Sequence, residues 1–383
     1  MKLALRLFLP FAAGYFLSYL LRNVNAIIAP ELTRELGLSA ANLGLLTSAY
    51  LLAFSAVQLP LGILLDRYGP RRVEASLLLV AALGAGGFAL GSNLGELALA
   101  RAAIGVGVSA CLMAAFKAFS MWYPTERLPA LNSAVMVAGG LGALAATTPV
   151  AWLEAAIGWR MIFFGLAALF TLAAAGIWTT PERSSASAGA TLGQQWRELL
   201  GVYGSATFWR YAPMTMMIVG GFVALQGLWA APWLMQVEGL ARGDTAQRLF
   251  VLTVAMVGGL LATALFIDRL RRAGIASSTV MIVGNLVGLA AMGAIAAGVG
   301  PPLLAWVVLG AMFAAANIAY AQLTSLFAPH LAGRVNTALN LVGFVAAFAI
   351  QWSYGVALDT LKEAGWTPAQ AHRPACSALL ALQ

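Results

Sequence analysis

The chain has 383 residues, of which 61% are hydrophobic and only 9% are charged. Soluble domains carry about 25% charged residues, so this composition excludes a soluble enzyme and predicts an all-α polytopic membrane protein. The net charge of +8 would suggest a nucleic-acid partner in a soluble protein, but here it fits an excess of Lys and Arg in cytoplasmic loops. We therefore expect the lipid bilayer as the surroundings, with no enzyme activity, cofactor or nucleic-acid partner.

A helix needs about 20 apolar residues to cross the bilayer core, and the chain contains a series of such stretches. They are 5–29, 42–65, 73–92, 95–121, 131–152, 159–178, 210–234, 247–267, 277–298, 302–326 and 335–358. A further stretch begins near residue 370, but about fourteen residues at about 1.5 Å each reach only part of the way across. The sequence thus predicts an incomplete twelfth helix, and we expect that the chain is truncated there.

The first helix is expected to be retained rather than cleaved as a signal peptide, because Arg22 and Asn23 interrupt its apolar run. One of its faces is polar and carries Tyr15, Ser18, Tyr19, Arg22 and Asn25 at helical spacing. Lipid does not accept such a face, so we expect it to line a cavity in protein or water. The alternative is that Arg22 extends outward to the membrane surface.

A charged hairpin follows the second helix, with the sequence Gly-Ile-Leu-Leu-Asp-Arg-Tyr-Gly-Pro-Arg-Arg from Gly62 to Arg72. Asp66 is placed to pair with Arg67 or Arg71 and to cap a neighbouring helix. Gly62 permits close helix approach and Gly69 permits a tight turn. The alternative is a basic turn on the cytoplasmic side with no mechanical role.

The spacing G-x-L-x-D-R-x-G-x-R in this hairpin resembles the loop signature of the major facilitator superfamily of transporters. The resemblance implies two six-helix bundles related by a pseudo-twofold axis, and a loop that latches their cytoplasmic sides together during alternating access. Within that superfamily, the run from Asn42 to Arg72 looks like bacterial members grouped loosely with nitrate/nitrite porters. The paired arginines of that group in helices 2 and 8 are not visible here, which puts nitrate as substrate in doubt.

The fourth helix carries Arg101, Gly105 and Gly107, which are similar to the R-x-x-x-G-x-G element of proton-linked members of the superfamily. The resemblance implies a structural or coupling role, whereas the alternative is a structural arginine that reaches the membrane surface beside a glycine packing face. Lys117 in the same helix is a candidate substrate contact, with the same alternative of reaching the surface.

A polar linker at 179–209, with Ser184, Ser185, Ser187 and Gly189, separates two groups of helices. We therefore predict a first bundle at 1–178 and a second at 210–383. An internal repeat supports this division: Asp268 and Arg269 lie in a charged segment between the second and third helices of the second half. That copy lacks both glycines of the first hairpin, and we expect it to share the gating role.

The second half offers neutral polar groups on helical faces, and Gln226, Asn317 and Tyr320 are the candidate substrate contacts. Thr324, Asn336 and Asn340 lie near them in the sequence. Trp229 and Trp233 accompany Gln226, and the alternative for these two, above all for Trp233, is a place in the aromatic belt at the membrane surface.

The acidic residues are all expected in loops or at helix ends, and His330 and His372 outside the spans, so that no buried acid or histidine is predicted. The membrane interior would then hold three cations, Arg22, Arg101 and Lys117, without an anion. Such a set is costly, and an anionic substrate would compensate it. The alternative is that all three side chains extend to the membrane surface.

We therefore hypothesise a monomeric transporter of a small organic anion, with Arg22 as the main charge contact and Lys117 as a second. Tyr15, Tyr19, Gln226, Asn317 and Tyr320 would orient the solute. The mode of coupling is left open between uniport, anion exchange and proton symport. The alternatives are a proton-coupled drug efflux pump, which predicts a buried acid, and a non-transporting sensor or assembly factor on the same fold.

The distribution of basic residues predicts the orientation in a bacterial inner membrane. With the N-terminus in the cytoplasm, most Lys and Arg fall on the cytoplasmic side, among them Lys2, Arg6, Arg67, Arg71, Arg72, Arg269, Arg271 and Arg272.

Overall fold

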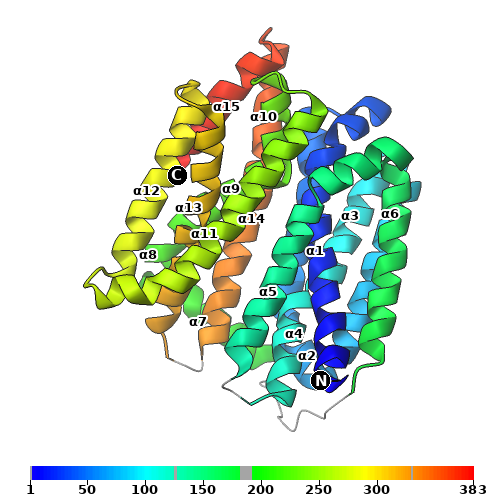
Figure 1. The fold of residues 1–383 in the computed structure, drawn as a ribbon, viewed down its shortest axis with the longest axis vertical. Coiled ribbons are helices and arrows are strands. Elements are labelled where there is room, and N and C mark those ends of the chain that lie inside the picture. Colours follow the sequence, from blue (N-terminus) through cyan, green and yellow to red (C-terminus); the bar gives the residue numbers. More distant parts are fainter. Residues whose placement is uncertain (1, 125–126, 182–191, 329–330) are drawn as a thin grey trace. The chain divides into compact units, whose positions relative to one another are not determined.

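A computed structural model describes residues 2–124, 127–181, 192–328 and 331–383, and this part of the chain is helical without strands (Figure 1). The helices are α1 (Lys2–Leu36), α2 (Ala40–Leu90), α3 (Leu94–Val108), α4 (Cys111–Trp122), α5 (Leu128–Ala145), α6 (Thr148–Trp178), α7 (Leu192–Tyr203), α8 (Ala206–Met214), η2 (Thr215–Val219), α9 (Gly220–Ala224), η3 (Leu225–Trp229), α10 (Ala230–Gln236), α11 (Arg242–Arg272), α12 (Ser277–Ala297), α13 (Pro302–Ser325), α14 (Ala332–Glu363) and α15 (Pro368–Leu382). The segments η2 and η3 are π-helical.

Ten helices among the described residues are long and apolar enough to cross a membrane, and Ala130–Ala145 is a shorter apolar helix. The chain is therefore a multi-pass membrane protein, as its composition predicted. The helices change direction at glycines. Gly69 (φ 80°, ψ 156°) divides α2 into two spans and Gly158 (φ 75°, ψ 160°) interrupts α6. A side chain is strained at such positive φ values, so glycine is required at both turns.

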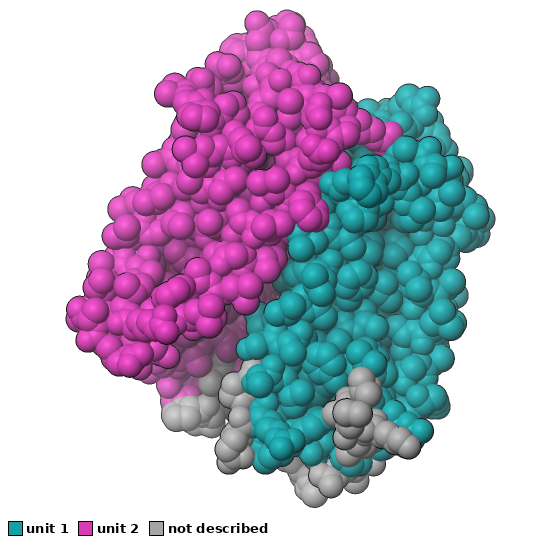
Figure 2. Space-filling model, viewed as in Figure 1, with its two compact units in different colours: residues 1–37, 49–196 teal, residues 38–48, 197–383 magenta. Residues whose placement is uncertain are grey.

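The chain forms two compact units, coloured separately in Figure 2. Unit 1 comprises residues 1–37 and 49–196, and unit 2 comprises 38–48 and 197–383. The first turns of α2 thus group with the second half of the chain, a feature that the sequence-based domain limits did not include.

Close helix packing in unit 1 centres on α1, which contacts α3, α4, α5 and α6. The face of α5 that meets α1 is made of glycines. A Cβ atom on Gly139 would overlap the Tyr15 ring, and one on Gly142 would overlap the Phe16 carbonyl. Without side chains at these two positions the helices approach closely, which is the usual way that membrane helices gain packing contacts.

Unit 2 uses the same small-residue packing between α11, α12 and α13. Gly259 meets Ala311, Gly310 meets Leu252, and Gly284 meets the Ala315 methyl group. The second helical group thus has its own close-packed core.

The predicted polar linker at 179–209 is partly helical, because α7 occupies Leu192–Tyr203. Arg334 of α14 donates to the Glu198 carboxylate at 3.1 Å, and the Tyr203 hydroxyl donates to the Ala338 carbonyl at 3.2 Å. These two contacts attach α7 to the first turns of α14. Ser184, Ser185, Ser187 and Gly189 of the predicted linker lie outside the described residues, as does His330.

The short stretch near residue 370 is the helix α15, which begins with a capping box formed by Thr367 and Gln370. His372 in its second turn is fully buried. Its Nδ1 lies 3.1 Å from the Tyr354 hydroxyl and its Nε2 lies 3.2 Å from the Gln236 side-chain oxygen. This histidine is therefore a hydrogen-bonded part of the packing of unit 2, and the expectation that no histidine is buried is wrong.

Candidate functional site

The side chains on the polar face of α1 differ in how deeply they are buried in unit 1. Ser18 and Asn25 are fully buried, Tyr15 is nearly so, and Tyr19 and Arg22 are partly exposed. The Tyr15 and Tyr19 rings meet edge to face, with their centroids 5.0 Å apart. This face contacts protein along most of its length, as expected for polar groups inside a membrane span.

Arg22 lies among aromatic side chains. Its guanidinium carbon is 4.6 Å from the centroid of the Tyr19 ring and 5.3 Å from that of Phe54 in α2. The Tyr15, Tyr19 and Tyr50 side chains lie near it. Cation–π contacts of this kind hold a planar guanidinium in a fixed orientation. Arg22 is thus a positioned cation, surrounded by aromatic rings and tyrosine hydroxyls.

Tyr50 and Phe54 were not among the residues proposed from the sequence. They are spaced by four residues in an apolar run, a pattern that packing residues and ligand contacts share. Only their position beside Arg22, where α1 meets α2, distinguishes these two residues from ordinary packing residues.

Two glycines of the fourth predicted helix allow it to pack closely against α2, where Tyr50 lies. A Cβ on Gly105 would overlap the Tyr50 carbonyl, and a Cβ on Gly107 would overlap the Ala81 backbone. Because both glycines lack a side chain, α3 lies directly against both spans of α2. The predicted single helix is divided here into α3 and α4, with Ser109 and Ala110 between them.

Arg101 is fully buried rather than extended to the surface. Its Nη1 donates to the Leu21 carbonyl at 3.0 Å. Its guanidinium carbon lies 5.2 Å from the ring centroid of Phe88 and 5.8 Å from that of Phe163. These contacts connect α3 to α1, α2 and α6.

In the hairpin, Asp66 forms an ion pair with Lys117 of α4. Arg71 donates to the carbonyls of Trp178 and Thr180 at 3.4 and 3.2 Å, while the Arg67 guanidinium lies over the Tyr68 ring at 5.4 Å. The hairpin is therefore fastened within unit 1 to both α4 and the end of α6. Gly62 is partly buried in the preceding span.

The second copy of the hairpin lies at the end of α11 and is more exposed. Asp268 pairs with Arg271 at 3.4 Å, with about 71% of each side chain exposed, and the Arg269 guanidinium lies over the Phe266 ring. The helix continues to Arg272 and turns at Gly274, which has a φ of 86°. The glycine missing from the repeat is thus replaced by one six residues after Asp268.

Three polar side chains proposed in unit 2 make separate contacts. Gln226 Nε2 donates to the Thr253 hydroxyl at 3.4 Å, and Asn317 Nδ2 donates to the Phe313 carbonyl at 3.1 Å. The Tyr320 hydroxyl donates to Asn340 Oδ1 at 2.8 Å. Gln226 lies in the π-helical segment η3, and such segments occur frequently at functional sites.

The interpretation of Trp229 and Trp233 as belt residues at the membrane surface is wrong. Both are buried, with about 2% of each residue exposed. The Trp229 indole donates to the Gln351 carbonyl at 2.9 Å, and Trp233 meets His372 at 5.9 Å between ring centroids. Burial is possible because each indole is enclosed by α14 or α15, which a hydropathy pattern does not reveal.

The expectation that no acid is buried is also wrong. Glu74, in the turn of helix that follows Gly69 and Pro70, is fully buried, and Glu154 of α6 is 6% exposed. Both oxygens of Glu74 lack an N–H or O–H donor among the described residues. Its place at the start of a span in the sequence suggested exposure, but α1 covers it through Gly14. Unit 1 therefore contains an anion-forming group as well as the cations Arg22 and Arg101.

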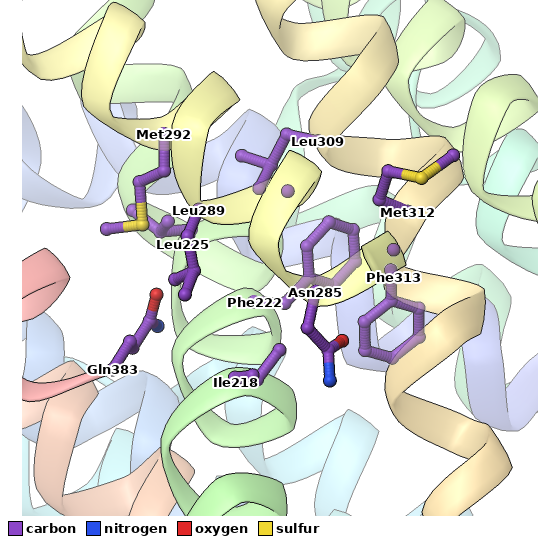
Figure 3. A pocket seen from close by; sticks show the side chains of 12 residues that line it. Ile218, Phe222, Leu225, Asn285, Leu289, Met292, Leu309, Met312, Phe313 and Gln383 are labelled. Atoms are coloured by element: carbon purple, nitrogen blue, oxygen red, sulfur yellow. The ribbon is translucent and has the colours of Figure 1, made fainter. Parts of the chain in front are cut away.

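A small cavity lies in unit 2 between α9, α12 and α13 (Figure 3). Its lining is mostly apolar, with Phe222 and Phe313 stacked at 4.2 Å and with Asn285 and Gln383 as polar members. None of the proposed substrate contacts lines it. The charged candidate site is instead the cluster of Arg22, Tyr15, Tyr19, Tyr50 and Phe54 in unit 1.

Comparisons with known proteins agree with this architecture. A family model described as Major Facilitator Superfamily matches residues 11–350. The fold is similar to that of a D-xylose–proton symporter, with a TM-score of 0.80 and 16% identity over 99% of this chain and 96% of the other. A nucleoside transporter gives a TM-score of 0.79 with 14% identity over 100% and 97% of the two chains.

Curated relatives match over shorter segments. The hexuronate transporter of Escherichia coli (strain K12) is 33% identical over 150 residues, 39% of this chain and 35% of its own length. The galacturonate transporter of Dickeya chrysanthemi is 32% identical over 156 residues, 41% and 45% of the two chains. The chloramphenicol resistance protein of Pseudomonas aeruginosa is 28% identical over 247 residues, 63% and 56%. The match thus spans less than two thirds of each of these relatives.

Proposed function

The chain belongs to the major facilitator superfamily, and on that premise we propose that it transports a small organic anion across the membrane by alternating access. The observation that carries the proposal is Arg22, a positioned cation in a membrane span with aromatic rings and tyrosine hydroxyls around it. A guanidinium binds a carboxylate in a bidentate manner, and tyrosine hydroxyls bond to further oxygens. We infer a bacterial inner-membrane location with the N-terminus in the cytoplasm.

Sugar acids fit this chemistry. A uronate offers one carboxylate for Arg22, hydroxyl groups for Tyr15 and Tyr19, and an apolar ring face for Phe54. The names of two relatives, a hexuronate and a galacturonate transporter, support the same class of solute. We propose that Gln226, Asn317 and Tyr320 contribute amide and hydroxyl groups for the remaining oxygens. The likeness to nitrate/nitrite porters stays a prediction.

For Lys117, the ion pair with Asp66 supports a gating role over a solute contact, because the ammonium is already engaged with the hairpin. We propose that Gly62, Asp66, Arg67, Gly69 and Arg71 form the latch in the first half, with Asp268 and Arg269 as its counterpart in the second.

The test is ligand-dependent thermal stability of the purified protein with D-galacturonate, and with neutral D-galactose as the matched control. Binding stabilises the folded state by mass action, by about 2.7 kcal/mol at a ligand concentration of 100 times Kd. We expect galacturonate alone to raise the unfolding temperature, and the Arg22→Ala variant to lose this response. Lys117→Ala should keep it. An equal response to both sugars, or a full response in Arg22→Ala, would overturn the anion site.

A second candidate function is efflux of an uncharged drug. Two observations favour it: the chloramphenicol resistance protein aligns over the longest of the three segments, and Glu74 supplies the buried acid that efflux by proton exchange predicted. Expression in a drug-sensitive host distinguishes the two. Resistance to chloramphenicol that survives Arg22→Ala would support efflux, whereas galacturonate uptake without resistance would support the anion transporter.

A further inference from the structure

Glu74 is an acidic side chain inside unit 1. It is fully buried, and no N–H or O–H group among the described residues donates to its carboxyl oxygens. A Cβ placed on Gly14 of α1 would lie 2.6 Å from Oε1, so α1 covers the carboxyl only because residue 14 is a glycine. Burying a carboxylate without a partner costs far more free energy than burying the neutral acid. Burial in this conformation therefore favours the neutral form of the carboxyl over the charged form.

The groups that face Glu74 are few and weakly polar. From α4, the Cys111 thiol lies beside the carboxyl and is a weak donor. From α1, Gly14 is in contact, and Tyr15 and Arg22 lie near the same thiol. On α2 itself, Arg71 is held by carbonyls at the end of α6. Among the described residues, no group neutralises a negative charge on Glu74 by direct contact.

The same helix carries both Arg22 and the glycine that covers Glu74. Gly14 and Arg22 are eight residues apart on α1, or about two helical turns. A displacement of α1 relative to α2 would therefore change the surroundings of both Arg22 and the Glu74 carboxyl. Once it meets water or a cation, Glu74 is able to release its proton, because the desolvation cost of the charged form disappears.

We propose that Glu74 is a proton-binding site that couples transport of the anion to movement of a proton; the inference rests on the proposed function. In each cycle one O–H bond forms as a proton is taken from one aqueous side and breaks as it is released to the other. No electrons are exchanged. A monoanion that moves with this proton carries no net charge across the membrane.

The experiment uses the purified full chain in liposomes with labelled D-galacturonate. Glu74→Gln has nearly the same size and resembles the permanently protonated acid, and Glu96→Gln is the matched control because Glu96 is an exposed carboxylate bonded to Ser92. We expect Glu74→Gln to exchange galacturonate between equal pools at a rate within about twofold of the original protein. It should lose the accumulation that an inward proton gradient drives. Glu96→Gln should retain both.

Three results would overturn the coupling role. One is gradient-driven accumulation by Glu74→Gln, and another is loss of exchange as well as accumulation in a folded variant, which would show a purely structural role. The third is exchange by the original protein without any response to a proton gradient, in which case the proposed transport function stands and the coupling fails.

Infrared spectroscopy provides a readout that needs no substrate. The original protein at neutral pH should show the carbonyl band of a protonated carboxylic acid, and Glu74→Gln should lack it. Should that variant fail to fold, Cys111→Ala removes the thiol next to the same carboxyl and should shift the band. The absence of the band in the original protein, or a band unchanged in both variants, would overturn the site whatever the solute is.

Discussion

At Arg101 the guanidinium lies between the rings of Phe88 and Phe163 and donates to the Leu21 carbonyl. Arg22, one residue further along α1, meets the Tyr19 and Phe54 rings but remains partly exposed. The two arginines therefore differ in exposure: Arg101 is fully buried, whereas Arg22 is partly exposed. Both satisfy the rule that an arginine inside a membrane span lies against protein or water.

Replacing Arg101 with Ala should destabilise the protein, because the Leu21 carbonyl loses its donor and two aromatic rings lose their packing partner. A hydrogen bond from a charged donor contributes about 1.5–3 kcal/mol. Thermal unfolding in detergent, followed by tryptophan fluorescence, measures the loss. Arg210→Ala is the control, since Arg210 is exposed and its removal should change stability by less than about 0.5 kcal/mol. Equal unfolding temperatures for the two variants would contradict the packing role.

Sequence patterns at the residue scale identified the polar face of α1, because polar residues at i, i+3, i+4 spacing in a membrane span share one side of the helix. They missed Glu74, Tyr50 and Phe54. The reason is physical: whether a group near a helix end is buried depends on which helix crosses it. For Glu74, that helix is α1 at Gly14.

At the scale of elements, α3 meets α2 at two glycines. A Cβ atom on Gly105 would meet the Tyr50 carbonyl, whereas a Cβ atom on Gly86 of α2 would have no other atom within 4 Å. A methyl group added to Gly105 must push α2 away at the position that presents Tyr50 to Arg22. The same methyl group on Gly86 meets nothing.

We therefore expect Gly105→Ala to weaken galacturonate binding by about tenfold, a loss of about 1.4 kcal/mol, and Gly86→Ala to leave binding unchanged. Ligand titration followed by thermal shift measures both. Binding that is equally strong in the two variants would show that the contact between α3 and α2 does not position the Arg22 cluster.

The start of α2 is capped by a side chain from a distant part of the chain. Asp359 of α14 accepts the backbone N–H groups of Ala40 at 3.0 Å and Ala41 at 2.7 Å. Ser39 accepts that of Asn42 at 3.2 Å, so three of the unbonded N–H groups at this terminus are satisfied. A Cβ on Gly355 would overlap the Ala40 carbonyl, and one on Gly44 would lie 2.7 Å from the Gln351 carbonyl.

Asp359→Ala should therefore cost about 0.5–2 kcal/mol of stability, the range measured for loss of a helix cap. Amide hydrogen exchange at Ala40 and Ala41 should be faster, since their donors lose the carboxylate. Glu363→Ala, an exposed acid one turn later on α14, serves as the control. Unchanged exchange at these two amides in Asp359→Ala would show that the carboxylate is dispensable as a cap.

Elements were predicted well where composition alone decides them. The apolar stretches are helical, and Gly69 makes the expected turn. The break between α3 and α4, the π-helical segments and the helix α7 were not predicted. Each of these depends on packing or on hydrogen bonds to other helices, and local sequence carries little record of such contacts.

At the scale of the whole molecule, the orientation in the membrane is still a prediction from the distribution of Lys and Arg. With the N-terminus in the cytoplasm, the loop at Ser92 lies outside and the turn at Ala273 lies inside. Both native cysteines are buried, so a new surface cysteine is distinguishable.

We expect a membrane-impermeant thiol reagent to label the Ser92→Cys variant in cells with a permeabilised outer membrane and an intact inner membrane. The Ala273→Cys variant should be labelled only after the inner membrane is opened. Both residues are exposed in the structure, so accessibility of the thiol is not limited by packing. The reverse labelling pattern would invert the topology, and with it the side on which the hairpin from Gly62 to Arg72 operates.

The sequence by itself determined that this is a multi-pass helical membrane protein, because a chain with so few charges cannot form a water-exposed surface. It also determined the turn at Gly69 and the polar face around Arg22, since both follow from local chemistry. Only the tertiary structure decided that Glu74 is buried, that Lys117 pairs with Asp66, and that Asp359 caps α2. These three depend on contacts between residues far apart in the chain, which hydropathy and periodicity do not encode.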